Sequence, residues 1–176
     1  ISFRNASDGW ATGMTSATDR PWLYMTHDGG YHWQAQTLPL LPDVHNAFYE
    51  TTPPVLLGSY GLLPVIAGDT MQRGTVFYTT YDGGAHWTPR TLSLFVAQTV
   101  YIVDARHAWA SDSGTVYETS DGGYSWVVRS RLAAVTEFSF IDTFHGWAIE
   151  SSDSHANLYR TQDGGWTWHA VNYTLR

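Results

Sequence analysis

Cysteine and lysine are both absent from this chain of 176 residues, and its nine basic residues are all arginine. Without cysteine the chain can form no disulfide and carry out no thiol chemistry. Charged residues make up only 14% of the sequence, against roughly 25% in an average soluble domain. Acidic residues outnumber basic ones, and the formal net charge of −7 argues against a protein that binds the phosphate backbone of nucleic acids.

Long apolar runs are missing as well. No segment approaches the roughly 18–20 residues that span a bilayer as a helix, and we expect no signal peptide, because the start lacks a basic region followed by an apolar one. The chain begins at Ile1 rather than Met, from which we expect a mature product or a fragment. Hydrophobic residues reach 43% and aromatic residues 15%, which excludes a disordered chain.

One eight-residue pattern, T-x-D-G-G-x-x-W, occurs four times, at residues 26–33, 80–87, 119–126 and 161–168. We call these copies box 1 to box 4. Their fixed residues are Thr26, Asp28, Gly29, Gly30 and Trp33; Thr80, Asp82, Gly83, Gly84 and Trp87; Thr119, Asp121, Gly122, Gly123 and Trp126; and Thr161, Asp163, Gly164, Gly165 and Trp168. Successive boxed Asp residues are 54, 39 and 42 positions apart, so the sequence predicts a repeat architecture.

More of each unit repeats. An apolar segment with Tyr precedes every box, and a small-Trp-Ala segment lies upstream in three copies, at residues 9–11, 108–110 and 146–148. In the second copy, residues 54–57 and 62–66 take the corresponding places. We predict four short strands and no helix in each unit. The prediction rests on the alternation of apolar and polar residues, on the many aromatic residues, and on the Gly, Asp and Pro residues that separate these segments.

Four-stranded units of about 45 residues have the size of propeller blades. We therefore predict an all-β fold: a β-propeller segment spanning 1–176, built from four-stranded antiparallel blades. The predicted blades are residues 1–40, 41–94, 95–132 and 133–176, with residues 40–52 as a loop between blades. Because the chain starts with a first strand and ends with a fourth, we expect it to belong to a larger ring or to a ring completed by a second copy. A closed four-bladed ring is the alternative.

The box itself predicts a tight turn between two strands. Gly adopts positive φ without strain, the Asp carboxylate can accept backbone N–H bonds, and the Thr hydroxyl can close the same loop. The Trp is expected to pack over the turn, in the wedge between blades. Calcium would need 6–8 oxygen ligands, and one carboxylate per loop is too few. The eight His are scattered, which favours surface positions over metal ligands. We predict no metal and no cofactor.

The box resembles the Asp-box, or bacterial neuraminidase repeat, of sialidases, xyloglucanases, sortilin-type receptors and photosystem II stability/assembly factor-like proteins. The fuller unit, F-x-D-x-x-x-G-W-A followed by Y-x-T-x-D-G-G-x-x-W, is most similar to the last family and is clearest in residues 140–148 and 158–168. The resemblance implies a propeller in which the box joins the third and fourth strands, away from the face that binds ligands. It also implies an exported location, whether extracellular, periplasmic or membrane-associated.

On the opposite face, the resemblance implies that loops between the second and third strands carry any ligand site. Polar residues in these loops form a candidate ligand rim, which we weigh against simple solvated turns. The rim residues are Asp19, Arg20, Asp69, Arg73, Asp112, Asp153 and His155.

Two classes of function remain from the sequence. We favour a non-catalytic propeller that binds a protein, a glycan or another extracellular ligand. The alternative is a glycoside hydrolase or sialidase-like enzyme, or a scaffold fragment of one. Against a sialidase, Phe3-Arg4 continues with Asn5-Ala6 where the family's motif F/Y-R-I-P has Ile-Pro. No spacing selects a pair of catalytic carboxylates, so we predict no catalytic residue.

Overall fold

The structure of the chain is a computed structural model that describes residues 1–15, 21–39, 48–68, 73–151 and 156–172. Within these ranges, the regular elements are 17 β-strands, all paired antiparallel in three sheets. The chain divides into two compact units, Ile1–Val96 and Ala97–Arg176. The prediction of an all-β, antiparallel fold is confirmed.

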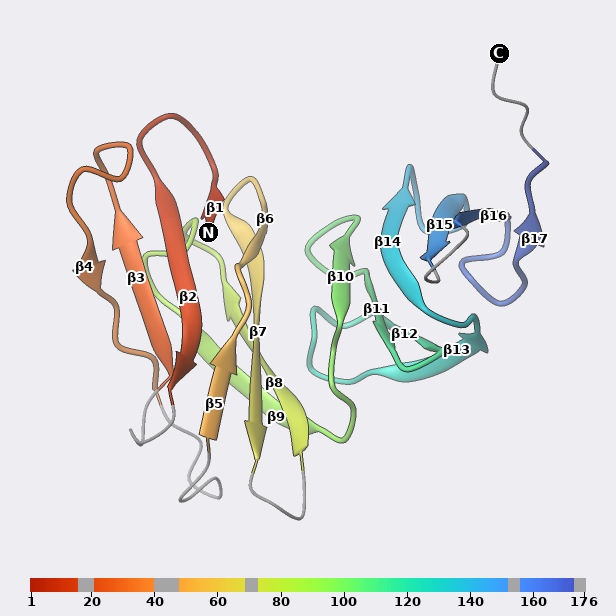
Figure 1. The fold of residues 1–176 in the computed structure, drawn as a ribbon, viewed down its shortest axis with the longest axis horizontal. Helices are drawn as coiled ribbons and strands as arrows, with labels where there is room; N and C mark the ends of the chain where they lie inside the picture. Colours follow the sequence, from red (N-terminus) through yellow and green to blue (C-terminus); the bar gives the residue numbers. More distant parts are fainter. Residues whose placement is uncertain (16–20, 40–47, 69–72, 152–155, 173–176) are drawn as a thin grey trace. The chain divides into compact units, whose positions relative to one another are not determined.

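The second unit contains two separate four-stranded sheets, each a simple meander in chain order. The first sheet consists of β10 (Thr99–Ile102), β11 (Ala108–Asp112), β12 (Thr115–Thr119) and β13 (Val127–Arg131). The second consists of β14 (Val135–Phe140), β15 (Gly146–Ser151), β16 (Ala156–Thr161) and β17 (His169–Ala170). Both follow the order of strands that the repeat pattern predicts (Figure 1).

The first unit forms one nine-stranded sheet in place of two separate ones. Its first repeat supplies β1 (Ser2–Phe3), β2 (Gly9–Thr15), β3 (Trp22–Thr26) and β4 (Gln34–Ala35). Its second repeat supplies β5 (Phe48–Thr51), β6 (Val55–Leu57), β7 (Tyr60–Gly68), β8 (Arg73–Thr80) and β9 (Thr88–Ser93). The two sets merge because β5 pairs with both β2 and β7.

β5 corrects the sequence analysis, which took residues 40–52 as a loop. Residues 48–51 pair with β7, and β6 pairs with a different part of the same strand. Between β5 and β6 stand Pro53 and Pro54, which have no backbone N–H and interrupt the ladder. Thr51 is buried, and its hydroxyl lies 2.9 Å from the Gly13 carbonyl and 2.6 Å from the Trp22 carbonyl. The first strand of the second repeat is therefore split in two.

A cross-strand pair explains the small residue of the small-Trp-Ala segment. Phe140 lies opposite Gly146 in the register of β14 and β15, and a Cβ on that glycine would lie 2.4 Å from the Phe140 ring. Phe3 and Gly9 repeat the arrangement in the first unit. In the third repeat the pair is Ile102 and Ala108, a smaller side chain opposite a larger one. The pair thus keeps its combined volume while the residues change.

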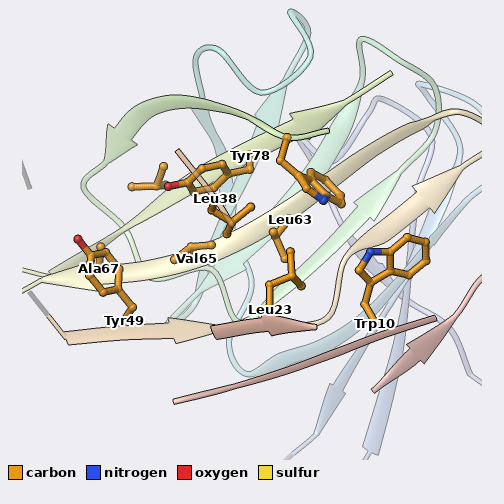
Figure 2. Close-up of a cluster of buried hydrophobic side chains, with 10 residues drawn as sticks. Trp10, Leu23, Leu38, Tyr49, Leu63, Val65, Ala67 and Tyr78 are labelled. Atoms are coloured by element: carbon orange, nitrogen blue, oxygen red, sulfur yellow. The ribbon is translucent and has the colours of Figure 1, made fainter. Parts of the chain in front are cut away.

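The core of the first unit lies between β2, β3, β5, β7 and β8, where Figure 2 shows its packed side chains. Trp10 and Leu63 are completely buried, and Tyr78 is nearly so. The Tyr78 hydroxyl donates to the Pro39 carbonyl at 2.7 Å. Burial, together with the neighbouring Tyr49, raises the pKa of Tyr78, so this phenol stays neutral and serves as a structural donor.

The core of the second unit is aromatic. Trp109 is completely buried and stacks on Phe140 with ring centroids 4.0 Å apart and planes 16° from parallel. Trp168 meets the same Phe140 ring edge-on at 6.0 Å. Tyr101 packs against this core, and its hydroxyl donates to the Phe140 carbonyl at 3.0 Å, which joins the two sheets of the unit.

Candidate functional site

Each box folds into the same hydrogen-bonded turn between the third and fourth strands of its repeat. In box 4, the Thr161 hydroxyl donates to Asp163 at 2.8 Å and accepts the Gly165 N–H at 2.9 Å. The carboxylate of Asp163 also accepts the N–H of Thr167 at 2.9 Å and its hydroxyl at 2.6 Å. Boxes 1, 2 and 3 repeat the bonds of the Thr hydroxyl and the backbone N–H bond to the Asp. The second side-chain bond to the Asp comes from the Ser125 hydroxyl in box 3, and a His ring nitrogen takes its place in boxes 1 and 2. The fixed Thr and Asp therefore satisfy the turn's own polar groups.

Both glycines of every box have positive φ, for example 75° at Gly83 and 93° at Gly84. Glycine takes up this conformation without the strain that a Cβ causes. The N–H of the first glycine donates a hydrogen bond outside the box, to a carbonyl in the turn between the first two strands of the same repeat. In the second repeat, the Gly83 N–H donates to the Ser59 carbonyl at 2.8 Å. The four repeats share this bond, so the two turns at one edge of each repeat are tied together.

The turn between the first two strands is held by a set of hydrogen bonds that recurs in three repeats. Asp142 Oδ1 accepts the N–H groups of Phe144 and His145, both at 2.7 Å. Asp104 does the same in the third repeat, and Asn5 takes the place of the Asp in the first. Sequence reasoning missed Asn5, although Asn and Asp side chains form this kind of turn interchangeably.

Among the residues that the structure describes, five histidines pair with an aspartate at this edge of their repeats. The pairs are His27–Asp8, His32–Asp28, His86–Asp82, His107–Asp104 and His145–Asp142. The four-residue spacing within boxes 1 and 2 is the signal that could have predicted the pairs of His32 and His86. Within the described ranges, no group of three or more His, Asp or Glu side chains could hold a metal ion.

Hydrogen bonds keep the boxed carboxylates acidic. Burial acts to raise the pKa of Asp163, but the hydrogen bonds from Thr167 and Thr161 outweigh burial and lower the pKa to about 2. In box 1, the backbone and side chain of His32 lower the pKa of Asp28, and His86 acts in the same way on Asp82. These carboxylates are therefore ionised at neutral pH.

We expect acid to weaken the second unit as Asp163 takes up a proton. Its pKa of about 2 in the fold lies below the ~3.9 of an unfolded chain, so its contribution to stability is complete above pH ~4 and is lost as the pH falls toward ~2. Asp163→Asn is expected to lower the urea midpoint at neutral pH and to reduce its decline between pH ~4 and ~2. Equal declines in the two proteins would contradict this role of Asp163.

Five of the seven rim residues lie outside the residues that the structure describes: Asp19, Arg20, Asp69, Asp153 and His155. Arg73 begins β8, and its guanidinium carbon lies 4.4 Å from the centre of the Phe48 ring. Asp112 ends β11, where Ser113 and Gly114 have φ of 43° and 89°, as in a two-residue hairpin with positive φ at both positions. Arg73 belongs to the first unit and Asp112 to the second.

One polar group that the sequence did not single out is the pair of Tyr159 and Glu150. The Tyr159 hydroxyl donates to Glu150 at 2.9 Å, and Asn157 donates to the same oxygen at 3.1 Å. The bond to Glu150 raises the pKa of Tyr159. A tyrosine nucleophile needs the phenolate to be accessible, whereas this contact stabilises the neutral phenol.

Within each unit, a Trp on the second strand of one repeat packs against the box of the next. Trp109 Nε1 donates to the Gly164 carbonyl of box 4 at 3.0 Å. Trp10 covers Gly84 of box 2 so closely that a Cβ there would lie 2.5 Å from its ring. In return, Trp168 Nε1 donates to Ser130 on β13 at 3.1 Å. Within each unit, the second of the two boxes therefore contributes to the contact between the two repeats.

No known protein-family model matches the chain. The chain is 32% identical over 171 residues to the Photosystem II assembly lipoprotein Ycf48 of Synechococcus sp. (strain CC9902), and the match covers 95% of this chain. This likeness shows distant homology to that protein. The chain spans just under half of the relative's length, 46%. Among the described residues, no helix is long and apolar enough to cross a membrane.

Proposed function

We propose that this chain is part of a photosystem II assembly factor, in which the Asp-box blades of a β-propeller bind protein partners without catalysing a reaction. The observation that carries this proposal is the 32% identity over 95% of the chain to a protein named as a photosystem II assembly lipoprotein. Because the match extends through nearly all of the chain, it covers the repeats rather than a single segment.

The propeller is supported by the way one repeat meets the next. Each repeat places a box turn at one edge, and in both units the strand-two Trp of one repeat packs on the following box. A contact that recurs between successive four-stranded units generates a regular succession of blades, as propellers require. Four such repeats would form part of a larger ring, or a ring completed by a second copy.

For the binding surface, we propose the exposed aromatic side chains of the box turns. Tyr31, Tyr124 and Trp166 occupy the same position, the residue after the second glycine, and are 86%, 57% and 55% exposed. Isolated exposed aromatics are common, but aromatic residues are also enriched where proteins bind each other. Recurrence at one position favours a common role. The rim on the opposite face, with Arg73 and Asp112, is the other surface that we propose for testing.

The relative is named a lipoprotein, and we propose an exported, membrane-associated location for this chain as well. The partners would then be protein components of photosystem II or of its assembly intermediates.

A chimera tests the function. In a Synechococcus strain that lacks the relative, the matched part of that protein is replaced by this chain, and light-driven oxygen evolution is measured. We expect the chimera to restore most of the lost oxygen evolution. A matched variant with Tyr31, Tyr124 and Trp166 all changed to Ser is expected to accumulate normally but to restore less. A chimera that accumulates without restoring any activity would contradict the proposal.

A further inference from the structure

The strand β13 forms the outer edge of its sheet. Among the described residues it pairs with β12 alone, so one side of its backbone faces no other strand. It is five residues long and contains no proline, so each of its residues carries a backbone N–H as well as a carbonyl. The unpaired backbone groups at such an edge are the complement of another extended strand.

The other three repeats also place their fourth strand at the edge of a sheet, but those strands differ from β13. Within the described ranges, β4 and β17 have only two residues each. β9 has six residues, but Pro89 at its second position has no backbone N–H to donate. Short edge strands and proline are two ways in which proteins prevent an edge from pairing with another chain. β13 has neither protection.

The edge of β13 lies inside the chain, and the repeat that follows it in the same unit has all four of its strands. In both units, successive repeats meet through the strand-two Trp and the following box. Among the described strands, none pairs with the fourth strand of another repeat. Further repeats that join in the same way would therefore leave the edge of β13 unpaired, so its occupant has to come from another protein.

A bulge at Arg129 bends β13, but residues 127–128 and 130–131 on its two sides keep regular pairing with β12. A charged side chain on an edge strand usually opposes pairing with another chain. Arg129 does not act in this way, because its guanidinium pairs with the buried Glu118 and lies 4.7 Å from the centre of the Trp166 ring. Its charge is therefore balanced within the fold.

The remaining side chains of β13 determine which strand fits its edge. Val127 and Val128 are 52% and 55% exposed, and Arg131 is exposed as well. Although the chain has a net charge of −7, residues 122–136 include no Asp or Glu. Opposite charges across a strand pair are stabilising. Two copies of β13 paired antiparallel about Arg129 would set Arg131 opposite Val127, so a second copy offers Arg131 no acidic partner.

We infer that the free edge of β13 binds an extended segment of a partner protein, with apolar residues beside Val127 and Val128 and an acidic residue beside Arg131. The inference rests on the proposed role in binding proteins, and it adds a strand edge to the box turns and the rim. Backbone hydrogen bonds between the two strands supply affinity, and the side chains select the segment. Trp166, which is 55% exposed and covered on one side by Arg129, extends the apolar surface beside the strand.

Fluorescence anisotropy of three dye-labelled peptides tests the inference. The first is a capped heptapeptide of alternating valine and glutamate. The second has lysine in place of glutamate, and the third keeps glutamate but is methylated at every backbone nitrogen. We expect the first peptide to bind the wild-type chain at least about tenfold more tightly than either of the others. The lysine peptide meets Arg131 with a like charge, and the methylated peptide has no backbone donor.

A charge exchange on the strand gives the matched comparison. Arg131→Glu is expected to weaken binding of the glutamate peptide about fivefold and to strengthen binding of the lysine peptide. Arg106→Glu makes the same change in net charge at an exposed residue of the same repeat, in the turn before β11, and should bind all three peptides like the wild type. Circular dichroism checks the folding of each variant. If Arg131→Glu does not fold, Val127→Asp replaces it and should also weaken the glutamate peptide.

Three results would overturn the inference. They are no binding of the glutamate peptide at ~1 mM, equal binding of the lysine or the methylated peptide, and equal effects of Arg131→Glu and Arg106→Glu. Sedimentation tests the other occupant, because a wild-type dimer that Val127→Asp abolishes would assign the edge to a second copy instead. A failed peptide experiment beside a chimera that restores oxygen evolution leaves the proposed function standing, and the reverse pair of results contradicts the proposed function alone.

Discussion

Replacing Trp109 by alanine is expected to lower the free energy of unfolding of the second unit by about 3–5 kcal/mol, the usual cost of removing a buried Trp. The side chain is completely buried and stacks on Phe140. Its Nε1 also donates a hydrogen bond to the Gly164 carbonyl. The variant loses the packing of a large ring, leaves a cavity and removes the donor to that carbonyl at the same time.

Trp147→Ala is the matched control for this prediction, since it makes the same change at the same position of the next repeat. Trp147 is partly exposed, and we expect a loss of only about 1 kcal/mol. Urea unfolding should be followed by far-ultraviolet circular dichroism, because both changes remove a fluorophore. Equal losses in the two variants would contradict the role assigned to the contact between Trp109 and box 4.

A second large effect is expected from alanine at Gly84. Its φ of 93° and the Trp10 ring, 2.5 Å from the site of a new Cβ, both oppose the change. Gly30 has the same φ of 93°, but its nearest neighbour, the Trp33 ring, would lie 3.4 Å from the new atom. Gly30→Ala therefore measures the backbone strain alone, about 1–2 kcal/mol. Gly84→Ala should cost a further ~1–3 kcal/mol, because the buried indole of Trp10 has to move.

The comparison of these two glycine variants needs only the difference between their unfolding free energies. Both residues lie in the first unit and both lose the same backbone freedom on folding, so the effect of alanine on the unfolded chain cancels. A Gly84→Ala protein no less stable than Gly30→Ala would show that Trp10 does not constrain box 2.

Much of the local structure could be predicted from the sequence because it is built from short-range bonds. Thr161, Asp163 and Gly165 satisfy one another within five residues, so the pattern alone indicates the turn. The strand order of each meander follows in the same way from its spacing.

What the sequence could not predict depends on contacts between distant residues. β5 was missed because its pairing with β2 and β7 is decided by strands that lie far away along the chain. The sequence pattern also treats three Trp residues as equivalent, so it could not predict that Trp10 and Trp109 are buried while Trp147 is partly exposed. The rim came from the family resemblance and stays a prediction, because five of its seven residues lie outside the residues that the structure describes.

The double pairing of β5 gives the two units different routes to local opening. In the first unit, a continuous ladder of backbone hydrogen bonds runs through both repeats, so neither can detach without breaking bonds that β5 makes to β2 or β7. In the second unit, the two sheets are separate ladders, joined by side-chain contacts such as Tyr101 to Phe140. The first unit should therefore open as a single cooperative block, whereas the second can separate into two.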